Sequence, residues 1–192
     1  MNVCIVTPRY FPNSRGGGER SCHLIASELN HTVNVEVISF DGKTTSSTEI
    51  DGVSVHRLKP ASSEKTSLNI QCFNYLRNRL GKFDLIHTYN MDLMPSIGLL
   101  TGRYKINSVA TLNGTVFSRM NEWYYKFINS KSNMKHNIFS ISLLSRNVFL
   151  IELIKKIRKF TALCRFRRES FIQEGLPGEK ITVIPNILDI DR

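Results

Sequence analysis

The sequence predicts an α/β domain with a doubly wound, Rossmann-like fold and a mainly parallel β-sheet. Short segments rich in β-branched residues alternate along the chain with segments that carry apolar residues at helical spacing. The strand segments are apolar rather than half polar, which is typical of strands buried on both faces. With 192 residues, 41% of them hydrophobic, the chain can bury one sizeable core.

The first strand is expected at 3–8, followed by a long loop and a helix at Ser21–Leu29 with apolar residues along one face. Six further strands are expected at 33–40, 52–58, 83–89, 106–114, 160–166 and 180–186. Three further helices are expected at 67–80, 91–103 and 167–175. Because ligands of such folds bind outside the carboxyl ends of the strands, the residues that follow each strand are the candidate site residues.

Three consecutive glycines, Gly16, Gly17 and Gly18, lie between the first strand and its helix. The unpaired N–H groups and the positive end of a helix form an anion site, and glycine lets a phosphate approach the backbone closely. Glu19 either caps the helix start or contacts the ligand directly. The spacing of the glycines from the strand, roughly seven residues, is too long for the tight dinucleotide turn. Asp41, after the second strand, nevertheless keeps an NAD-binding domain open as an alternative.

The chain is strongly basic, with a formal charge of +10 and a pI near 9.7, so an acidic partner is expected. The four cysteines are far apart and include no CxxC pair, so no metal site is predicted. The first residues lack the pattern of a secretory signal peptide, which favours a cytoplasmic location. The sequence also lacks RNP-like and zinc-finger motifs, so nucleic acid is not the expected partner.

Part of the positive charge gathers in the segment 145–160, which is predicted to form a basic amphipathic helix. Such a helix can lie at the surface of an anionic membrane, and the inner membrane face is the location this suggests. An ordinary core-facing helix with a solvated basic face is the alternative. The segment has too few consecutive apolar residues to span a bilayer. The predicted membrane contacts are Arg146, Lys155, Lys156, Arg158 and Lys159.

Four sequence pieces, in order along the chain, carry a family resemblance. They are GGGERSCHLIASEL after the first strand, FDLIHTYN at the fourth, TLNG at the fifth, and FTALCRFRRESFIQEGLPGEKITVIPNILD at the end. The last piece is the most specific, because it combines strand, helix and the passage into an interdomain hinge. With these pieces the chain resembles the N-terminal, acceptor-side domain of family 4 glycosyltransferases, which have the two-domain GT-B fold.

The resemblance implies a retaining transferase that moves a sugar from a nucleotide-sugar donor to a glycan or lipid-linked acceptor, without a metal or other cofactor. The glycine loop would face the diphosphate of the donor as it leaves. At Asn113 the family frequently has a histidine, and asparagine cannot titrate near neutrality. At the position of Tyr89 the family frequently has a second histidine. The substrate-binding residues implied after the later strands are His87, Asn90, Asn113, Gly114 and Arg165.

The resemblance covers only half of a GT-B enzyme. It implies an N-terminal domain at 1–185, the start of a hinge at 186–192, and an absent C-terminal domain that binds the donor. We therefore expect no turnover from this chain without a donor-binding domain or chain. Two alternatives stay open: a non-catalytic module that docks on a membrane or a partner, and a fragment of an NAD-binding oxidoreductase.

Overall fold

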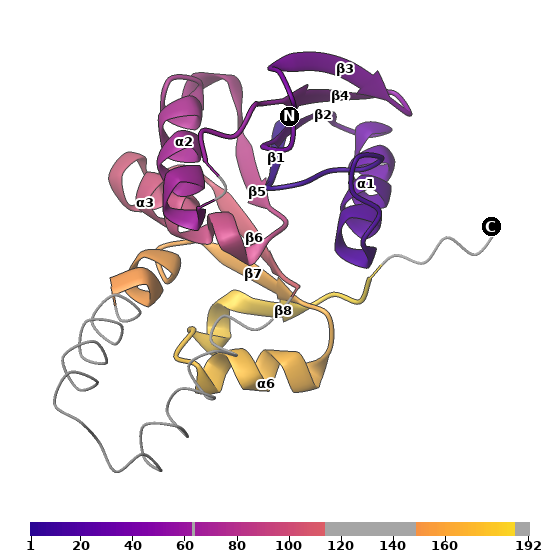
Figure 1. The fold of residues 1–192 in the computed structure, drawn as a ribbon. Helices are drawn as coiled ribbons and strands as arrows, with labels where there is room; N and C mark the ends of the chain where they lie inside the picture. Colours follow the sequence, from indigo (N-terminus) through magenta and orange to yellow (C-terminus); the bar gives the residue numbers. More distant parts are fainter. Residues whose placement is uncertain (63, 114–148, 187–192) are drawn as a thin grey trace, which may run out of the picture.

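The computed structural model describes residues 1–62, 64–113 and 149–186 and has one mainly parallel sheet (Figure 1). The strand order is β3-β4-β2-β1-β5-β6-β7-β8, and every pair is parallel except β3 with β4. The strands are β1 (Asn2–Thr7), β2 (Asn34–Ser39), β3 (Ser46–Ile50), β4 (Val53–Arg57), β5 (Leu85–Thr88), β6 (Ser108–Leu112), β7 (Lys159–Ala162) and β8 (Ile181–Val183).

Helices cover both faces of this sheet, so the predicted doubly wound α/β fold is confirmed (Figure 1). The α-helices are α1 (Gly17–Asn30), α2 (Lys65–Arg77), α3 (Met94–Tyr104) and α6 (Arg165–Gln173). Residues 149–154 are also helical. Short 3₁₀ turns lie at η1 (Leu80–Lys82), η2 (Met91–Leu93) and η3 (Gly178–Lys180).

Two hydrophobic clusters fill the space between helices and sheet. Along β1, Val3 and Ile5 belong to the cluster under α1, whereas Cys4 and Val6 belong to the cluster under α2, α3 and α6. This alternation follows from the two-residue period of a strand. Apolar side chains on both faces of the central strands explain why those strands read as continuous apolar runs in the sequence.

Two predicted elements differ from the structure. β3 was not expected, because its sequence lacks apolar alternation; it forms as an antiparallel edge strand against β4, with four exposed residues and a partly buried Ile50. The basic amphipathic helix predicted at 145–160 is wrong in its extent. Its helical part ends at Ile154, and Lys159 already begins β7. Lys155, Lys156 and Arg158 therefore lie in the connection between helix and strand rather than on one helical face, and Arg146 lies outside the described residues.

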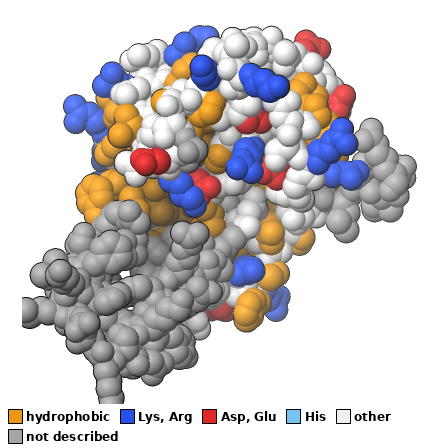
Figure 2. Space-filling model, viewed as in Figure 1, with side chains coloured by type: hydrophobic (Ala, Val, Ile, Leu, Met, Phe, Trp, Pro, Cys, Tyr) orange, Lys and Arg blue, Asp and Glu red, His pale blue; other side chains and the backbone are white. Residues whose placement is uncertain are grey.

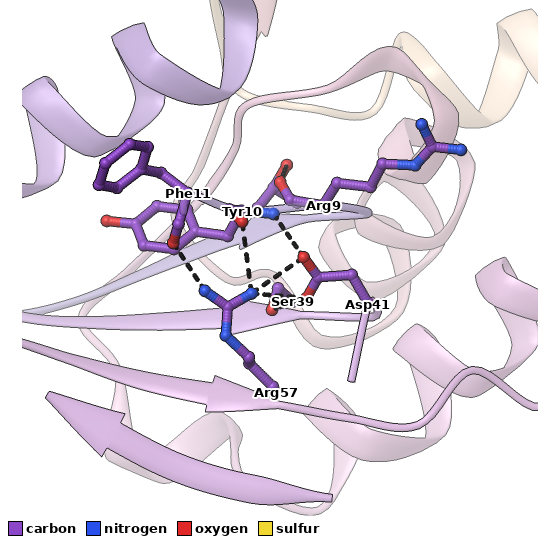
Figure 3. A network of polar contacts seen from close by, with 7 residues as sticks. Arg9, Tyr10, Phe11, Ser39, Asp41 and Arg57 are labelled. Carbon is purple, nitrogen blue, oxygen red and sulfur yellow. Dashed lines mark hydrogen bonds and ion pairs between the residues drawn. The ribbon is translucent and has the colours of Figure 1, made fainter. Parts of the chain in front are cut away.

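The loop between β1 and α1 is fixed by a buried ion pair (Figure 3). Nη1 of Arg57, on β4, lies 2.8 Å from Oδ1 of Asp41, and both side chains are almost fully buried. Arg57 also donates to the backbone carbonyls of Tyr10, at 3.3 Å, and Phe11, at 2.6 Å. Asp41 accepts from the Tyr10 N–H and from the Ser39 hydroxyl. The loop and Ser39 at the end of β2 therefore supply the remaining hydrogen bonds of the pair.

Replacing Arg57 with methionine is expected to lower the free energy of unfolding by about 3–5 kcal/mol, because Asp41 then stays buried without its cation. Urea unfolding of wild type and Arg57→Met measures this difference. Lys65→Met serves as the control, since its ion pair with Asp92 is exposed and its loss should cost less than about 1 kcal/mol. Equal losses in the two variants would contradict the structural role given to Arg57.

Candidate functional site

The candidate site lies at the carboxyl ends of β1, β5, β6 and β7. From β1 the chain first builds the sheet outward through β2 and β4, and then returns to β5 on the other side of β1. Open parallel sheets bind ligands at such a reversal of strand order. The predicted site residues of the first, fourth, fifth and sixth strands lie at neighbouring strands in this part of the sheet; His87 is within β5, and the others follow their strands.

The glycine segment forms the start of α1. The helix begins at Gly17, four residues before the predicted start, with Gly16 as its N-cap and no side-chain cap hydrogen bond. Gly17 and Gly18 are exposed, and a Cβ on either would meet no atom within 4 Å. At Gly16 a Cβ would collide with the carboxylate of Glu19, which is folded back toward the helix start. The exposed backbone of the first turn thus leaves open space beside N–H groups that have no partner within the helix.

Tyr89 joins three parts of the candidate site. Its ring is buried, its backbone carbonyl accepts from Nδ2 of Asn113 at 2.9 Å, and its hydroxyl donates to Oδ1 of Asn186 at 3.3 Å. The ring also contacts His87 edge to face, with 5.8 Å between centroids. Tyr89 therefore connects β5 with the end of β6 and with the chain after β8. The sequence marked it only by its departure from the family pattern.

His87 is a partly buried member of β5. Its Nε2 lies 2.7 Å from the hydroxyl of Thr111 on β6, and that hydroxyl lies 2.9 Å from the hydroxyl of Thr161 on β7. Burial lowers the pKa of His87 to about 4. The imidazole is therefore neutral at pH 7 and acts as a hydrogen-bonding group rather than as a charged partner for phosphate.

The two asparagines have different roles in the structure. Oδ1 of Asn90 accepts from the N–H of Asp92 at 2.9 Å and so caps the turn before α3. Asn113 donates to Tyr89, but its Oδ1 is buried and has no hydrogen-bond partner among the described residues. A buried acceptor without a donor costs free energy unless a ligand or water supplies one. Asn113 is thus the better candidate for ligand contact.

Arg165 is the first residue of α6 and is exposed, and among the described residues no ion pair or hydrogen bond holds its side chain. Cys164, which precedes it, is a free and exposed thiol. Gly114 lies outside the described residues. Two cavities of about 280 Å³ and 320 Å³ lie elsewhere. Both are lined by Glu36 and Lys82, and neither is lined by a residue of the candidate site.

The part of the chain that the structure describes holds no group of three or more His, Cys, Asp or Glu arranged to bind a metal. In the same part, no helix combines the length and the apolar character needed to cross a bilayer. Asp41, the residue that would hold the ribose in an NAD-binding domain, is occupied by Arg57, Tyr10 and Ser39. The structure therefore gives no support to the NAD-binding alternative at that residue.

Comparisons with solved structures show the same fold in proteins of about twice the length. Anabaena HepE in complex with UDP-glucose matches 100% of this chain with 45% of its own, at 14% identity and a TM-score of 0.62. Sucrose-phosphate synthase from Thermosynechococcus elongatus matches 96% with 47% of its own, at 10% identity and a TM-score of 0.67. UDP-GlcNAc 2-epimerase from Methanocaldococcus jannaschii matches 97% of this chain with 46% of its own, at 12% identity and a TM-score of 0.56.

At these identities the likeness shows the fold alone, and the presence of an epimerase among the matches illustrates that one fold serves different reactions. No curated protein sequence matches the chain significantly. The family model described as Glycosyltransferase Family 4 matches residues 15–192, which is most of the chain. The chain therefore belongs to glycosyltransferase family 4 and contains one α/β domain of the GT-B fold.

Proposed function

We propose that this chain is the acceptor-side half of a retaining hexosyltransferase, which moves a sugar from a nucleotide-sugar donor to a glycan or lipid-linked acceptor in the cytoplasm. The reaction needs no metal or other cofactor in this proposal. The observation that carries it is the exposed first turn of α1, at the carboxyl end of β1 and beside the point where the strand order of the sheet reverses. The family match and the UDP-glucose complex of HepE support a nucleotide sugar as donor.

In the proposed mechanism the backbone N–H groups around Gly17 and Gly18 stabilise the diphosphate as it leaves. These dipoles are fixed before the reaction begins, so they stabilise the developing charge without rearranging. The positive end of α1 adds to this effect. The carboxylate of Glu19, now folded toward Gly16, would have to yield to an arriving phosphate.

Asn113 orients a substrate hydroxyl in this proposal, because its Oδ1 has no partner among the described residues and can accept a hydrogen bond. Neutral His87 holds Thr111 in place on the neighbouring strand and performs no acid-base step. Arg165, which forms no ion pair with a described residue, offers a cation to the donor phosphates from the start of α6. The donor nucleotide and sugar are held mainly by a second domain, so turnover by this chain alone is not part of the proposal.

Transfer from radiolabelled nucleotide sugars to a pool of glycan and lipid-linked acceptors tests the proposal. The assay compares this chain alone, a candidate donor-domain chain alone, and the mixture of both. We expect labelled product only in the mixture. Transfer by the isolated chain would overturn the proposed division of labour, and saturable NAD binding without any response to nucleotide sugars would overturn the proposal itself.

Alanine at Gly17 or Gly18 is expected to separate function from stability. The methyl group meets open space and alanine favours a helix by up to about 1 kcal/mol, so the melting temperature should stay equal or rise. The same methyl group keeps the diphosphate off the backbone, so transfer in the mixture should fall at least about tenfold, or about 1.4 kcal/mol of transition-state stabilisation.

Gly81→Ala is the matched control, because a Cβ there also meets no atom within 4 Å and the residue lies in η1, away from the site. Its transfer rate should equal that of the wild type. If Gly17→Ala and Gly18→Ala also transfer at the wild-type rate while folding normally, the diphosphate does not approach this turn.

The stability of the domain is expected to depend on pH through His87. The unfolded chain takes up a proton near the ordinary pKa of about 6.5, whereas the folded histidine resists protonation until about pH 4. The free energy of unfolding should therefore fall as pH decreases from 6.5 to 4. Urea unfolding of wild type and His87→Gln across this range measures the effect. The variant should lose less stability on acidification, and parallel curves would contradict the lowered pKa.

A further inference from the structure

Five exposed cationic side chains lie on connected segments at the amino ends of the parallel strands, opposite the candidate site. They come from the carboxyl end of α3 and from the chain entering β7, where β6 and β7 begin. We call this surface the basic face; its members are Arg103, Lys105, Lys156, Arg158 and Lys159. Only part of it comes from the segment that the sequence singled out as basic, because α3 contributes the rest.

Direct contacts hold these segments together. Arg158 donates from Nε to the carbonyl of Ile106, at 3.0 Å, and from Nη2 to the carbonyl of Lys105, at 2.6 Å. The stem of Lys156 lies over Gly102, so closely that a Cβ on this glycine would come within 2.6 Å of Cδ. The basic face is thus a fixed surface built from two segments that lie some fifty residues apart in the sequence.

The positive charge of the basic face is not neutralised within the described residues. Glu152, the acidic residue nearest in sequence to Lys156 and Arg158, pairs with Lys155 instead, at 2.6 Å. No described carboxylate forms an ion pair with any of the five cations. The negative end of α3 favours Arg103 and Lys105 at the helix terminus, but it does not account for the three cations on the other segment.

Apolar surface lies next to these cations on α3. Leu99 and Tyr104 are exposed to 38% and 39%, and the guanidinium of Arg103 lies 5.7 Å from the centroid of the Tyr104 ring. In Figure 2 hydrophobic and basic side chains occur together at the left margin of the molecule, where Figure 1 draws α3. Aromatic rings with basic neighbours are typical of protein surfaces that enter a lipid headgroup layer.

We propose that the basic face docks the domain on the surface of an anionic lipid bilayer, with Tyr104 and Leu99 entering the headgroup layer. The negative bilayer complements the uncompensated cations, and the interface buries the two apolar side chains. Phosphates of a nucleic acid would complement the cations equally well, but they would leave Leu99 without an apolar contact.

Docking at this edge leaves the candidate site free. β6 runs from the basic face to Asn113, and its five residues span roughly 16 Å. The glycine turn and Asn113 would therefore face away from the bilayer. The proposal concerns attachment and does not depend on which sugar, if any, the domain helps to transfer.

Flotation with vesicles tests the proposal with the full chain. We expect binding to vesicles of phosphatidylcholine and phosphatidylglycerol at low salt, weaker binding at high salt, and none to phosphatidylcholine alone. The double variant Arg103→Gln and Lys156→Gln should bind about thirtyfold more weakly. Tyr104→Ser keeps the charge and should lower the part of the binding that survives high salt.

Lys43→Gln with Lys59→Gln is the matched control, since it removes the same charge from exposed lysines that follow β2 and β4. This control should bind vesicles like the wild type. Equal loss in both double variants would mean that only net charge matters and would overturn the proposal. Absence of vesicle binding by the folded wild type, with or without binding to duplex DNA or RNA, would also overturn it. Neither result bears on the transfer assay when its lipid-linked acceptors are supplied in detergent and no bilayer is present.

Discussion

The buried pair of Arg57 and Asp41 is the interaction on which the arrangement of the candidate site depends. It joins the end of β4 to the loop after β2, and three further hydrogen bonds connect it to the loop that leads from β1 into α1. The same loop is also held on its apolar side, because the ring of Tyr10 is fully buried in the cluster under α1 and Phe11 stacks on His23. Through this pair the position of the first turn of α1 is fixed by three strands rather than by the loop alone.

Tyr89 extends the same constraint to the other side of the chain reversal. Its backbone holds Asn113 and its hydroxyl reaches Asn186, where the chain leaves β8. A buried aromatic ring with one polar end suits this position, because the ring fills the core and the hydroxyl meets the polar edge. The predicted domain limit at 185 and the hinge after it stay predictions, but the residue at that limit is tied directly to the site.

The sequence predicted the fold well because the parallel strands are apolar on both faces and the glycine segment marks the first crossover. It failed where tertiary contacts outweigh local pattern. β3 pairs at an edge with Ile50 as its one apolar residue, and the apolar residues expected on one long helix divide between a short helix and β7. The buried role of Asp41 was also hidden, since its partner Arg57 lies sixteen residues away and only the folded sheet brings the two together.

The two ends of the parallel strands have different chemistry, and this division follows from the fold. At the carboxyl ends the first turn of α1 leaves open space beside its backbone, and Oδ1 of Asn113 has no hydrogen-bond partner among the described residues, so the recognition proposed there depends on a few directed hydrogen bonds. At the amino ends exposed cations gather without an ion-pair partner among the described residues, so their attraction for anions is long-ranged and depends on salt. A parallel sheet allows both proposed functions in one domain, because the same strands that position the candidate site also hold the basic face at a fixed distance from it.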